Sequence, residues 1–168
     1  MNKRPLAACL AALLLGAAVV AADDLSVIVD PKTDFSAFKT FALRDQKIGS
    51  PRPELNNSLF AKKLSTTIRA ALVERGLKED ARNPDMMVDY VLTGEDFSLS
   101  ARGLVRGAGP RPVQYTEGTL VIDLSRPNDT IPVWRGTYRD DENTGSKLML
   151  KLPEDAKKLL ARYPQRSK

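Results

Sequence analysis

Residues 116–138 carry the clearest periodic pattern in the chain, TEGTLVIDLSRPNDTIPVWRGTY. In the first half of this stretch, Leu120, Ile122 and Leu124 recur at every second position. Successive side chains of a β-strand point to opposite faces, so this spacing predicts a strand with one apolar face. The second half alternates in the same way around Trp134, and a cluster of turn-forming residues separates the halves. The stretch therefore predicts a β-hairpin with one face toward a core and one toward water.

Apolar residues on both sides of the hairpin recur with weaker strand or helix spacing. Together with the hairpin, they predict the element order β-β-α-β-β-β-α. The other predicted strands are residues 25–30, 39–43 and 86–92, the last continuing toward residue 99, and the predicted helices are residues 58–75 and 153–163. Helices that bury one face against a sheet predict a two-layer α+β fold. We expect a mainly antiparallel sheet with the two helices packed on one face.

The helix boundaries have specific signals. The residues Asn56, Asn57 and Ser58 can cap the start of the first helix, and Gly76 can end it in the left-handed conformation. Pro153 lies inside the apolar pattern of the last helix, and proline suits a first turn better than an interior one. We therefore predict that the firm helix starts near Pro153, with Glu154 and Asp155 at its positive end, and that a separate turn of helix before Pro153 is the alternative. The polar residues 139–145 before it are predicted to form a loop.

The N-terminus has the composition of a secretory signal peptide. Lys3 and Arg4 precede an apolar run over residues 6–22, which ends in small residues before Asp23. We predict a signal peptide over residues 1–22, a single α+β domain over residues 23–168, and a periplasmic location. An uncleaved membrane anchor is the alternative. Residues 6–9 resemble a lipoprotein acylation site, but most of the apolar run follows Cys9, so acylation is left open.

Removal of that leader takes away the only cysteine, and the chain of 168 residues contains no histidine. Thiol nucleophiles, histidine bases and zinc sites with histidine or cysteine ligands are then excluded. Loss of Lys3 and Arg4 also lowers the formal net charge from +5 to +3. This mild charge, without a basic stripe interleaved with aromatic residues, argues against nucleic-acid binding. We expect no cofactor and no metal.

Five segments together resemble one bacterial family. They are DFSAFKTFA at residues 34–42, NPD at 83–85, YTEGTLVIDL at 115–124, VWRGT at 133–137 and LLARYP at 159–164. In this order they look like the DUF4136 family of the bacterial cell envelope. The resemblance implies an exported or lipid-anchored protein of Gram-negative bacteria with an α+β fold. It implies no established activity and no catalytic residues.

The candidate ligand-binding residues are Arg102, Arg106 and Arg111, in a segment rich in glycine and proline. Guanidinium groups pair with phosphates and carboxylates, so this loop is predicted to bind an anionic lipid or glycan of the envelope, or a partner protein. A solvated loop without a ligand is the competing interpretation.

Other candidates have simpler structural interpretations. The acidic run Asp140-Asp141-Glu142 lacks the spacing of a calcium loop and is interpreted as a solvated turn. Trp134 is interpreted as a core anchor whose indole N–H finds a partner. The last helix is expected to dock on its own sheet, although its lysines are compatible with an anionic membrane surface.

The predicted function is therefore binding without catalysis. A rival hypothesis is a carboxylate-dependent hydrolase of envelope glycan that uses Asp89 and Asp123, since paired carboxylates can cleave a glycosidic bond without histidine or cysteine. A second rival is a carrier of lipid or another small ligand, which predicts an apolar cavity between the sheet and the helices.

Overall fold

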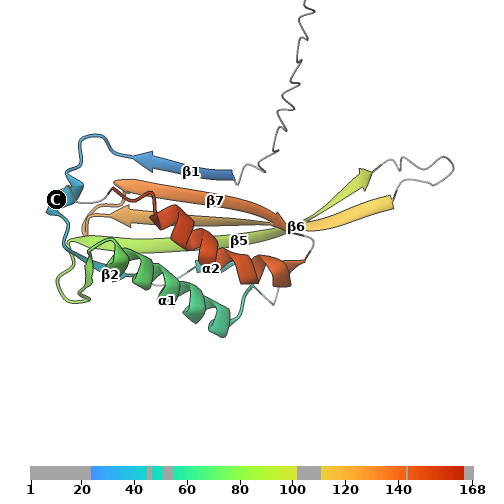
Figure 1. Cartoon of the computed structure of the whole chain (residues 1–168), viewed down its shortest axis with the longest axis horizontal. Coiled ribbons are helices and arrows are strands. Elements are labelled where there is room, and N and C mark those ends of the chain that lie inside the picture. Colours follow the sequence, from blue (N-terminus) through green and yellow to red (C-terminus); the bar gives the residue numbers. More distant parts are fainter. Residues whose placement is uncertain (1–23, 45–46, 51–54, 102–110, 143, 165–168) are drawn as a thin grey trace, which may run out of the picture.

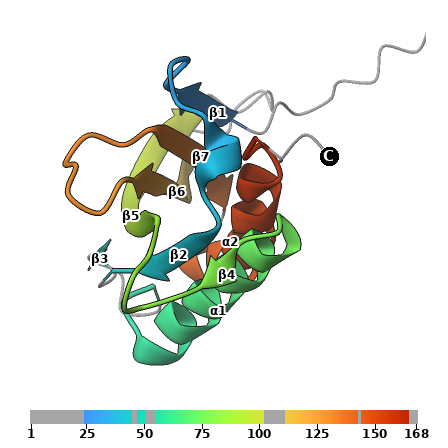
Figure 2. The same cartoon turned by 90° about the vertical axis from the view of Figure 1, so that its left-hand side faces the viewer.

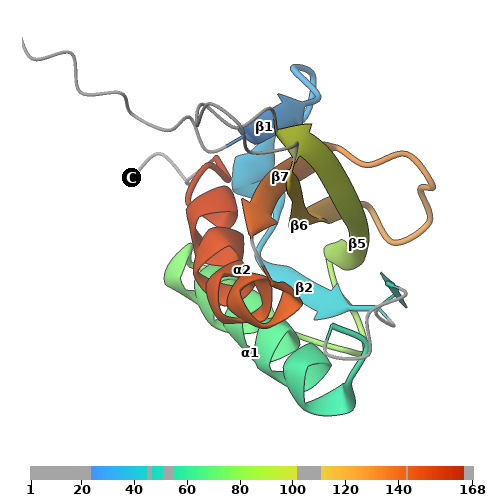
Figure 3. The same cartoon turned by 90° about the vertical axis from the view of Figure 1, so that its right-hand side faces the viewer.

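The computed structural model describes residues 24–44, 47–50, 55–101, 111–142 and 144–164. Two helices cover one face of a seven-stranded sheet, and Figures 1, 2 and 3 show both on the same side. The elements are β1 (Asp24–Val29), the 3-10 turn η1 (Phe35–Ala37), β2 (Thr40–Leu43), β3 (Lys47–Gly49), α1 (Ser58–Glu74), β4 (Lys78–Glu79), β5 (Met86–Ala101), β6 (Arg111–Ser125), β7 (Trp134–Glu142) and α2 (Gly145–Leu160). The predicted α+β class, with two helices on one face, is confirmed.

The strand order is β1-β7-β6-β5-β2-β4, with β3 also paired to β5. The pairs β1–β7, β6–β7 and β5–β6 are antiparallel, as predicted for most of the sheet. β2 and β3 instead run parallel to β5. The reason is the crossover through α1, which returns the chain to the sheet in the same direction. The first two strands of the chain consequently lie in different parts of the sheet, with β1 at an edge.

The hairpin of residues 116–138 forms as predicted. Leu124 pairs with Trp134 and Leu120 with Tyr138, and all four side chains are buried under the helices. The two strands are longer than the alternation indicated. β5 and β6 remain paired as far as Ala101 and Arg111, so they extend beyond the helical layer as a two-stranded arm (Figure 1).

α1 begins and ends where its signals indicated. The Asn57 side chain accepts a hydrogen bond of 2.7 Å from the backbone N–H of Phe60. Gly76 has a φ of 85°, a left-handed conformation in which glycine carries no steric penalty. The Leu77 N–H then bonds back to the Leu72 carbonyl at 3.2 Å, which closes the helix.

The predicted start of the last helix is wrong. α2 begins at Gly145, after a cap by Thr144, and continues through Pro153. Proline removes one intrahelical hydrogen bond, but Leu148 and Leu152 before it are fully buried, and burial of each contributes about 2 kcal/mol. That gain outweighs the missing bond. Glu154 and Asp155 therefore lie in the helix interior and not at its positive end.

The loop predicted for residues 139–145 is also wrong, because β7 continues to Glu142. Asp140 faces the helical layer, where Lys151 of α2 donates a hydrogen bond of 3.2 Å to its carboxylate. Only 11% of the Asp140 side chain is exposed. The first residue of the acidic run thus ties β7 to α2, and it is not part of a solvated turn.

Two glycines allow α2 to approach the sheet closely. A Cβ at Gly136 of β7 would lie 2.6 Å from Cγ of Leu159 and 2.5 Å from the Trp134 ring. A Cβ at Gly118 of β6 would overlap both methyl groups of Leu148. Contacts this short do not occur between real atoms, so a side chain at either position would have to displace a leucine of α2 and, at position 136, the Trp134 ring as well.

The aromatic residues near β2 belong to the core, as predicted. Phe41 is fully buried, Phe38 is 7% exposed, and Phe35 packs edge-on against Tyr163 with ring centroids 5.6 Å apart. Trp134 is fully buried as well. Its indole N–H has no hydrogen-bond partner within the described part of the chain, so the expectation of a partner is wrong.

Candidate functional site

The sheet face turned away from the helices, here called the outer face, is uncovered by any helix of the described chain (Figures 2 and 3). The strand alternation that buries Leu120, Ile122 and Leu124 directs Asp123 to this face. Asp89 of β5 is the register partner of Asp123, which is in turn the register partner of Arg135 of β7. The outer face therefore carries a row of charged side chains across three strands.

Asp123 and Arg135 form the tightest pair in this row. The Nε and Nη2 atoms of Arg135 donate to the two carboxylate oxygens at 2.6 and 2.7 Å. Such a two-point contact fixes the orientation of both groups. The hydrogen bonds to Asp123 raise the pKa of Arg135 above its ordinary value. About a quarter of the Asp123 side chain, 23%, remains exposed.

Asp89 is held from the other side by Arg44, which directly follows β2. The Nη1 atom of Arg44 lies 3.2 Å from a carboxylate oxygen of Asp89. The Nη2 atom of the same guanidinium donates to the backbone carbonyl of Pro127 at 3.3 Å. Arg44 thus links β5 to the connection between β6 and β7, which swings out on the outer-face side (Figure 2).

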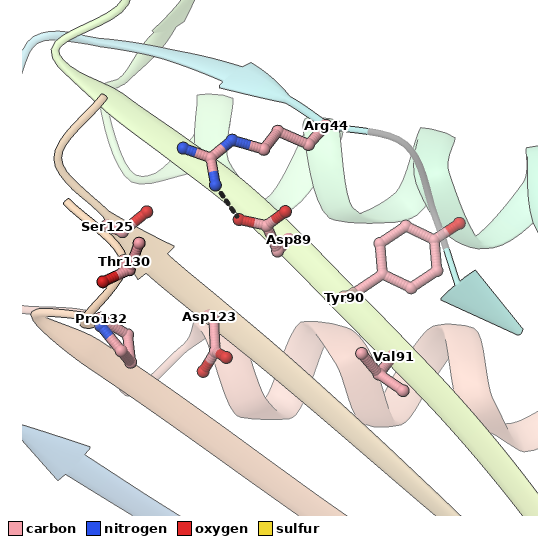
Figure 4. Close-up of a pocket in the computed structure, with 8 residues that line it drawn as sticks. All are labelled: Arg44, Asp89, Tyr90, Val91, Asp123, Ser125, Thr130 and Pro132. Carbon is pink, nitrogen blue, oxygen red and sulfur yellow. Dashed lines mark hydrogen bonds and ion pairs between the residues drawn. The ribbon is translucent and has the colours of Figure 1, made fainter. Parts of the chain in front are cut away.

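These groups surround a hollow of about 280 Å³ that opens to solvent, here called the outer-face hollow (Figure 4). β5 and β6 form its floor, and the β6–β7 connection forms one wall. Its lining residues are Arg44, Asp89, Tyr90, Val91, Asp123, Ser125, Thr130 and Pro132. The Tyr90 ring itself turns into the core, where its hydroxyl lies 2.9 Å from that of Ser65.

Ser125 at the end of β6 distinguishes this hollow from an ordinary surface depression. The residue is only 4% exposed, and its hydroxyl has no hydrogen-bond partner within the residues described. In Figure 4 the hydroxyl points toward the side of the Arg44 guanidinium. A buried hydroxyl without a partner costs about 1–3 kcal/mol, and a ligand group would supply the missing hydrogen bond once a small shift of the β6–β7 connection exposes the hydroxyl to the hollow.

The hollow offers both acceptors and donors over a small area. The Asp89 and Asp123 carboxylates accept, the Arg44 guanidinium donates, and the Ser125 and Thr130 hydroxyls do both. The two carboxylates face two guanidinium groups, so their charges balance. In the described part of the chain, no group of three or more histidine, cysteine, aspartate or glutamate residues has an arrangement that could hold a metal ion.

Sequence reasoning singled out Asp89 and Asp123, and the structure brings them together. It missed Arg44, Arg135 and Ser125. The alternation in β7 places Arg135 on the same face as Asp123, but nothing in the sequence indicated that Arg44 follows a strand parallel to β5. The pairing of distant segments created that contact.

The predicted ligand-binding loop lies largely outside the described residues. Arg102 and Arg106 fall in the segment 102–110, and of Arg111 only the backbone in β6 is described. The prediction for these three arginines stays a prediction. The described arm ends at Ala101 and Arg111, whereas the outer-face hollow lies near the other end of β5 and β6.

No helix in the described chain has both the length and the apolar composition needed to cross a membrane.

Comparison with solved structures supports the fold. The chain is similar to a DUF4136 family protein from Bacteroides thetaiotaomicron, with 12% identity, a TM-score of 0.52, and coverage of 82% of this chain and 91% of that one. It is also similar to a PDZ domain protein from Parabacteroides distasonis, with 15% identity and a TM-score of 0.57. That match covers 87% of this chain but only 36% of the other, so this chain spans about a third of its length.

A comparison with curated proteins found no match. The model of the family described as "Domain of unknown function (DUF4136)" matches residues 26–165. This range includes every helix and every strand described above, except the first two residues of β1. The resemblance that the five sequence segments indicated is thereby confirmed, and the chain belongs to the DUF4136 family.

Proposed function

We propose that this protein is a non-catalytic protein of the bacterial cell envelope, and that it acts by binding a polar ligand in the outer-face hollow. The leader-like residues 1–22 support an exported protein. The absence of histidine, and of cysteine after residue 9, supports binding over most nucleophilic and acid–base chemistry.

The observation that carries the proposal is the buried, unpaired Ser125 hydroxyl beside two carboxylates that arginines hold in place. The two carboxylates are already ordered by the arginines, so they bind a ligand at a lower entropic cost. Alternating acceptors and donors suit a ligand with several hydroxyl groups, and Val91 and Pro132 offer an apolar surface beside them. A sugar unit of an envelope glycan has this chemistry, and the hollow of about 280 Å³ has room for one ring.

A glycan hydrolase is the second candidate, because Asp89 and Asp123 are direct register partners. Cross-strand partners have Cβ atoms about 4.5–5.5 Å apart, which is close to the carboxylate spacing of retaining glycosidases. Hydrolysis also needs one carboxyl group to deliver a proton to the leaving oxygen. Both oxygens of Asp123 instead accept from Arg135, and Asp89 accepts from Arg44. This arrangement supports binding more than proton transfer.

The carrier hypothesis requires an apolar cavity between the sheet and the helices. Leu64 and Ile68 of α1, Leu120 and Ile122 of β6 and Leu152 of α2 meet there, and each has zero exposure to a water-sized probe. Side chains without accessible surface border no void large enough for water. The described interface between the layers is therefore filled, and it gives the carrier hypothesis no support.

A titration with N-acetylglucosamine tetramer, followed by backbone amide resonances, tests the proposal. We expect shifts confined to the ends of β5 and β6 around the hollow. Asp89→Asn and Ser125→Ala should each weaken binding about 10-fold, as the loss of one ligand hydrogen bond predicts. Thr119→Ala, on the outer face but away from the hollow, is the matched control and should bind like the parent.

The same samples separate binding from hydrolysis. If the parent protein releases shorter sugars and Asp89→Asn binds the tetramer without cleaving it, the protein is a hydrolase and the non-catalytic proposal is wrong. If no amide near the hollow shifts with the tetramer or with an acidic sugar such as glucuronate, the glycan assignment is wrong. Binding of glucuronate that is lost in a variant lacking Arg102, Arg106 and Arg111 would instead favour the arginine loop.

A further inference from the structure

β1 leaves one side of its backbone open. Among the described residues β1 pairs only with β7, and it forms one edge of the sheet. Natural edge strands are usually protected by lysine, proline or a bulge. The sequence of β1, DLSVIV, contains no lysine or proline and has its single charged residue, Asp24, at its first position, and its register with β7 is continuous from Asp24 to Val29. The edge is therefore a regular template for another strand.

The hydrogen bonds of β1 show which of its backbone groups are open. The N–H of Asp30 bonds to the Val133 carbonyl at 2.8 Å, which continues the β1–β7 ladder. Hydrogen-bonded positions alternate along an antiparallel strand, so Ile28 and Ser26 also bond toward β7. The N–H and C=O groups of Leu25, Val27 and Val29 consequently point away from the sheet.

A basic hollow lies beside this edge, on the helix side. Its volume is about 420 Å³, and it is lined by Leu25 and by Lys158, Ala161 and Arg162 at the end of α2. Lys158 is held near Asp155 and over the Tyr138 ring. Arg162 is exposed and forms no ion pair with a described residue. An acidic side chain beside Leu25 would therefore meet an available guanidinium.

From these features we infer that β1 accepts an extended peptide segment of a partner protein, which adds a strand to the sheet and carries an acidic side chain toward Arg162. In the added strand, the residues opposite Leu25, Val27 and Val29 would direct their side chains to the same side of the sheet as those three residues, which is the side of the helices. One of them reaches the basic hollow, while backbone hydrogen bonds supply the remaining contacts. This inference does not depend on the ligand of the outer-face hollow.

A second copy of the chain fits the edge less well. Antiparallel pairing of two β1 strands through Val27 would place Asp24 of each copy opposite Asp30 of the other. Like charges directly across a strand pair are destabilising, and the basic hollows would remain unpaired. Charge complementarity therefore favours a different chain with an acidic residue.

Selection from a library of random 12-residue peptides, against the purified protein, provides the probe. We expect recovered peptides to alternate apolar residues with an acidic residue on one face. Val27→Pro removes an outward N–H without touching the β7 ladder, and proline is tolerated on edge strands. It should weaken the recovered peptide at least 10-fold. Val27→Thr keeps the N–H and the branched shape, and it should bind like the parent.

Two further readouts keep the test decisive if Val27→Pro proves unstable. Arg162→Glu should weaken the same peptide about 10-fold, because it reverses the charge at the hollow. Bound peptide should also slow amide exchange at Leu25, Val27 and Val29, whereas Ser26 and Ile28 are already protected. Unchanged exchange at those three amides, or equal binding by all variants, would overturn the inference. Dimerisation that Val27→Pro abolishes, without peptide binding, would overturn it in favour of a second copy.

Discussion

Asp85 and Thr40 bind each other through reciprocal side-chain and backbone hydrogen bonds. The Asp85 carboxylate accepts from the Thr40 N–H at 3.0 Å, and the Thr40 hydroxyl accepts from the Asp85 N–H at 2.9 Å. The same carboxylate also accepts from the Lys39 N–H at 2.8 Å. These bonds join the NPD segment before β5 to the start of β2, and so align two parallel strands that no short turn connects.

Asp85→Asn is expected to lower the free energy of unfolding by about 1 kcal/mol in urea denaturation at neutral pH. An amide offers one acceptor oxygen in place of a charged carboxylate, and exposure to water keeps the loss small. Glu74→Gln, an exposed change at the end of α1, is the control and should have an effect below about 0.5 kcal/mol. Equal stabilities for the parent and Asp85→Asn would contradict the assigned role.

The effect of Asp85 should depend on pH with a defined sign. Hydrogen bonds from the Lys39 and Thr40 N–H groups lower the pKa of Asp85 below its ordinary value of 3.8. Its contribution to stability is therefore complete above that value and is lost as the pH falls through the lower pKa of the folded state. The difference between parent and Asp85→Asn should shrink in acid, as unfolding curves at several pH values can show.

Gly136→Ala is expected to destabilise the protein by about 1–3 kcal/mol, because the new methyl group overlaps Leu159 and the Trp134 ring. Leu159→Ala alone should cost about 2–5 kcal/mol through the cavity it leaves. The double variant should cost less than the sum, because the alanine methyl fills part of that cavity. Additive effects in thermal or urea unfolding would show that helix α2 does not rest on Gly136.

Asp155→Asn is expected to stabilise the protein at neutral pH. Asp155 is 2% exposed, and one of its carboxylate oxygens has no partner within the described residues. Burial raises the pKa of Asp155 above 3.8, although Lys158 and the Tyr138 hydroxyl act in the opposite direction. A raised pKa favours folding below 3.8 and loses that contribution as the pH rises through the folded-state value. The advantage of Asn should therefore grow from acid to neutral pH in unfolding measurements.

Ser125→Ala is expected to leave stability unchanged or slightly increased, since it removes a buried hydroxyl that lacks a partner. The same change should weaken a ligand that bonds to this hydroxyl in the outer-face hollow. Measured on one preparation, the free energy of unfolding should stay the same or rise slightly, while the affinity for the sugar falls. A clear loss of stability would show that the hydroxyl has a structural role in the free protein.

Local signals in the sequence predicted the elements that depend on neighbouring residues. The cap at Asn57, the left-handed Gly76 and the alternation around Leu120 each act over a few positions, and all are found. The predicted start of the last helix is wrong because the local cost of Pro153 is smaller than the gain from burying Leu148 and Leu152 before it. Tertiary burial overrides local preference in such cases.

Long-range pairing could not be predicted in the same way. Nothing near Arg44 indicates that β2 lies parallel to β5, so the contact with Asp89 was not foreseen. The glycines at positions 118 and 136 belong to the family-like segments of the sequence. Only the structure shows that leucines of α2 pack against these two positions. Two of the five residues that define the candidate site, Asp89 and Asp123, could be named from strand alternation. Its arginines and Ser125 required the assembled sheet.

The two-stranded arm formed by β5 and β6 extends the molecule beyond the part of the sheet that the helices cover. Beyond Glu95, six more residues of β5 stay paired with β6, which corresponds to an extension of about 20 Å. The helices contact the near part of these strands and leave the far part uncovered (Figure 1). Because this part of the arm lies beyond the helices, a change in its length or charge is expected to leave the packing of the helices on the sheet unaltered.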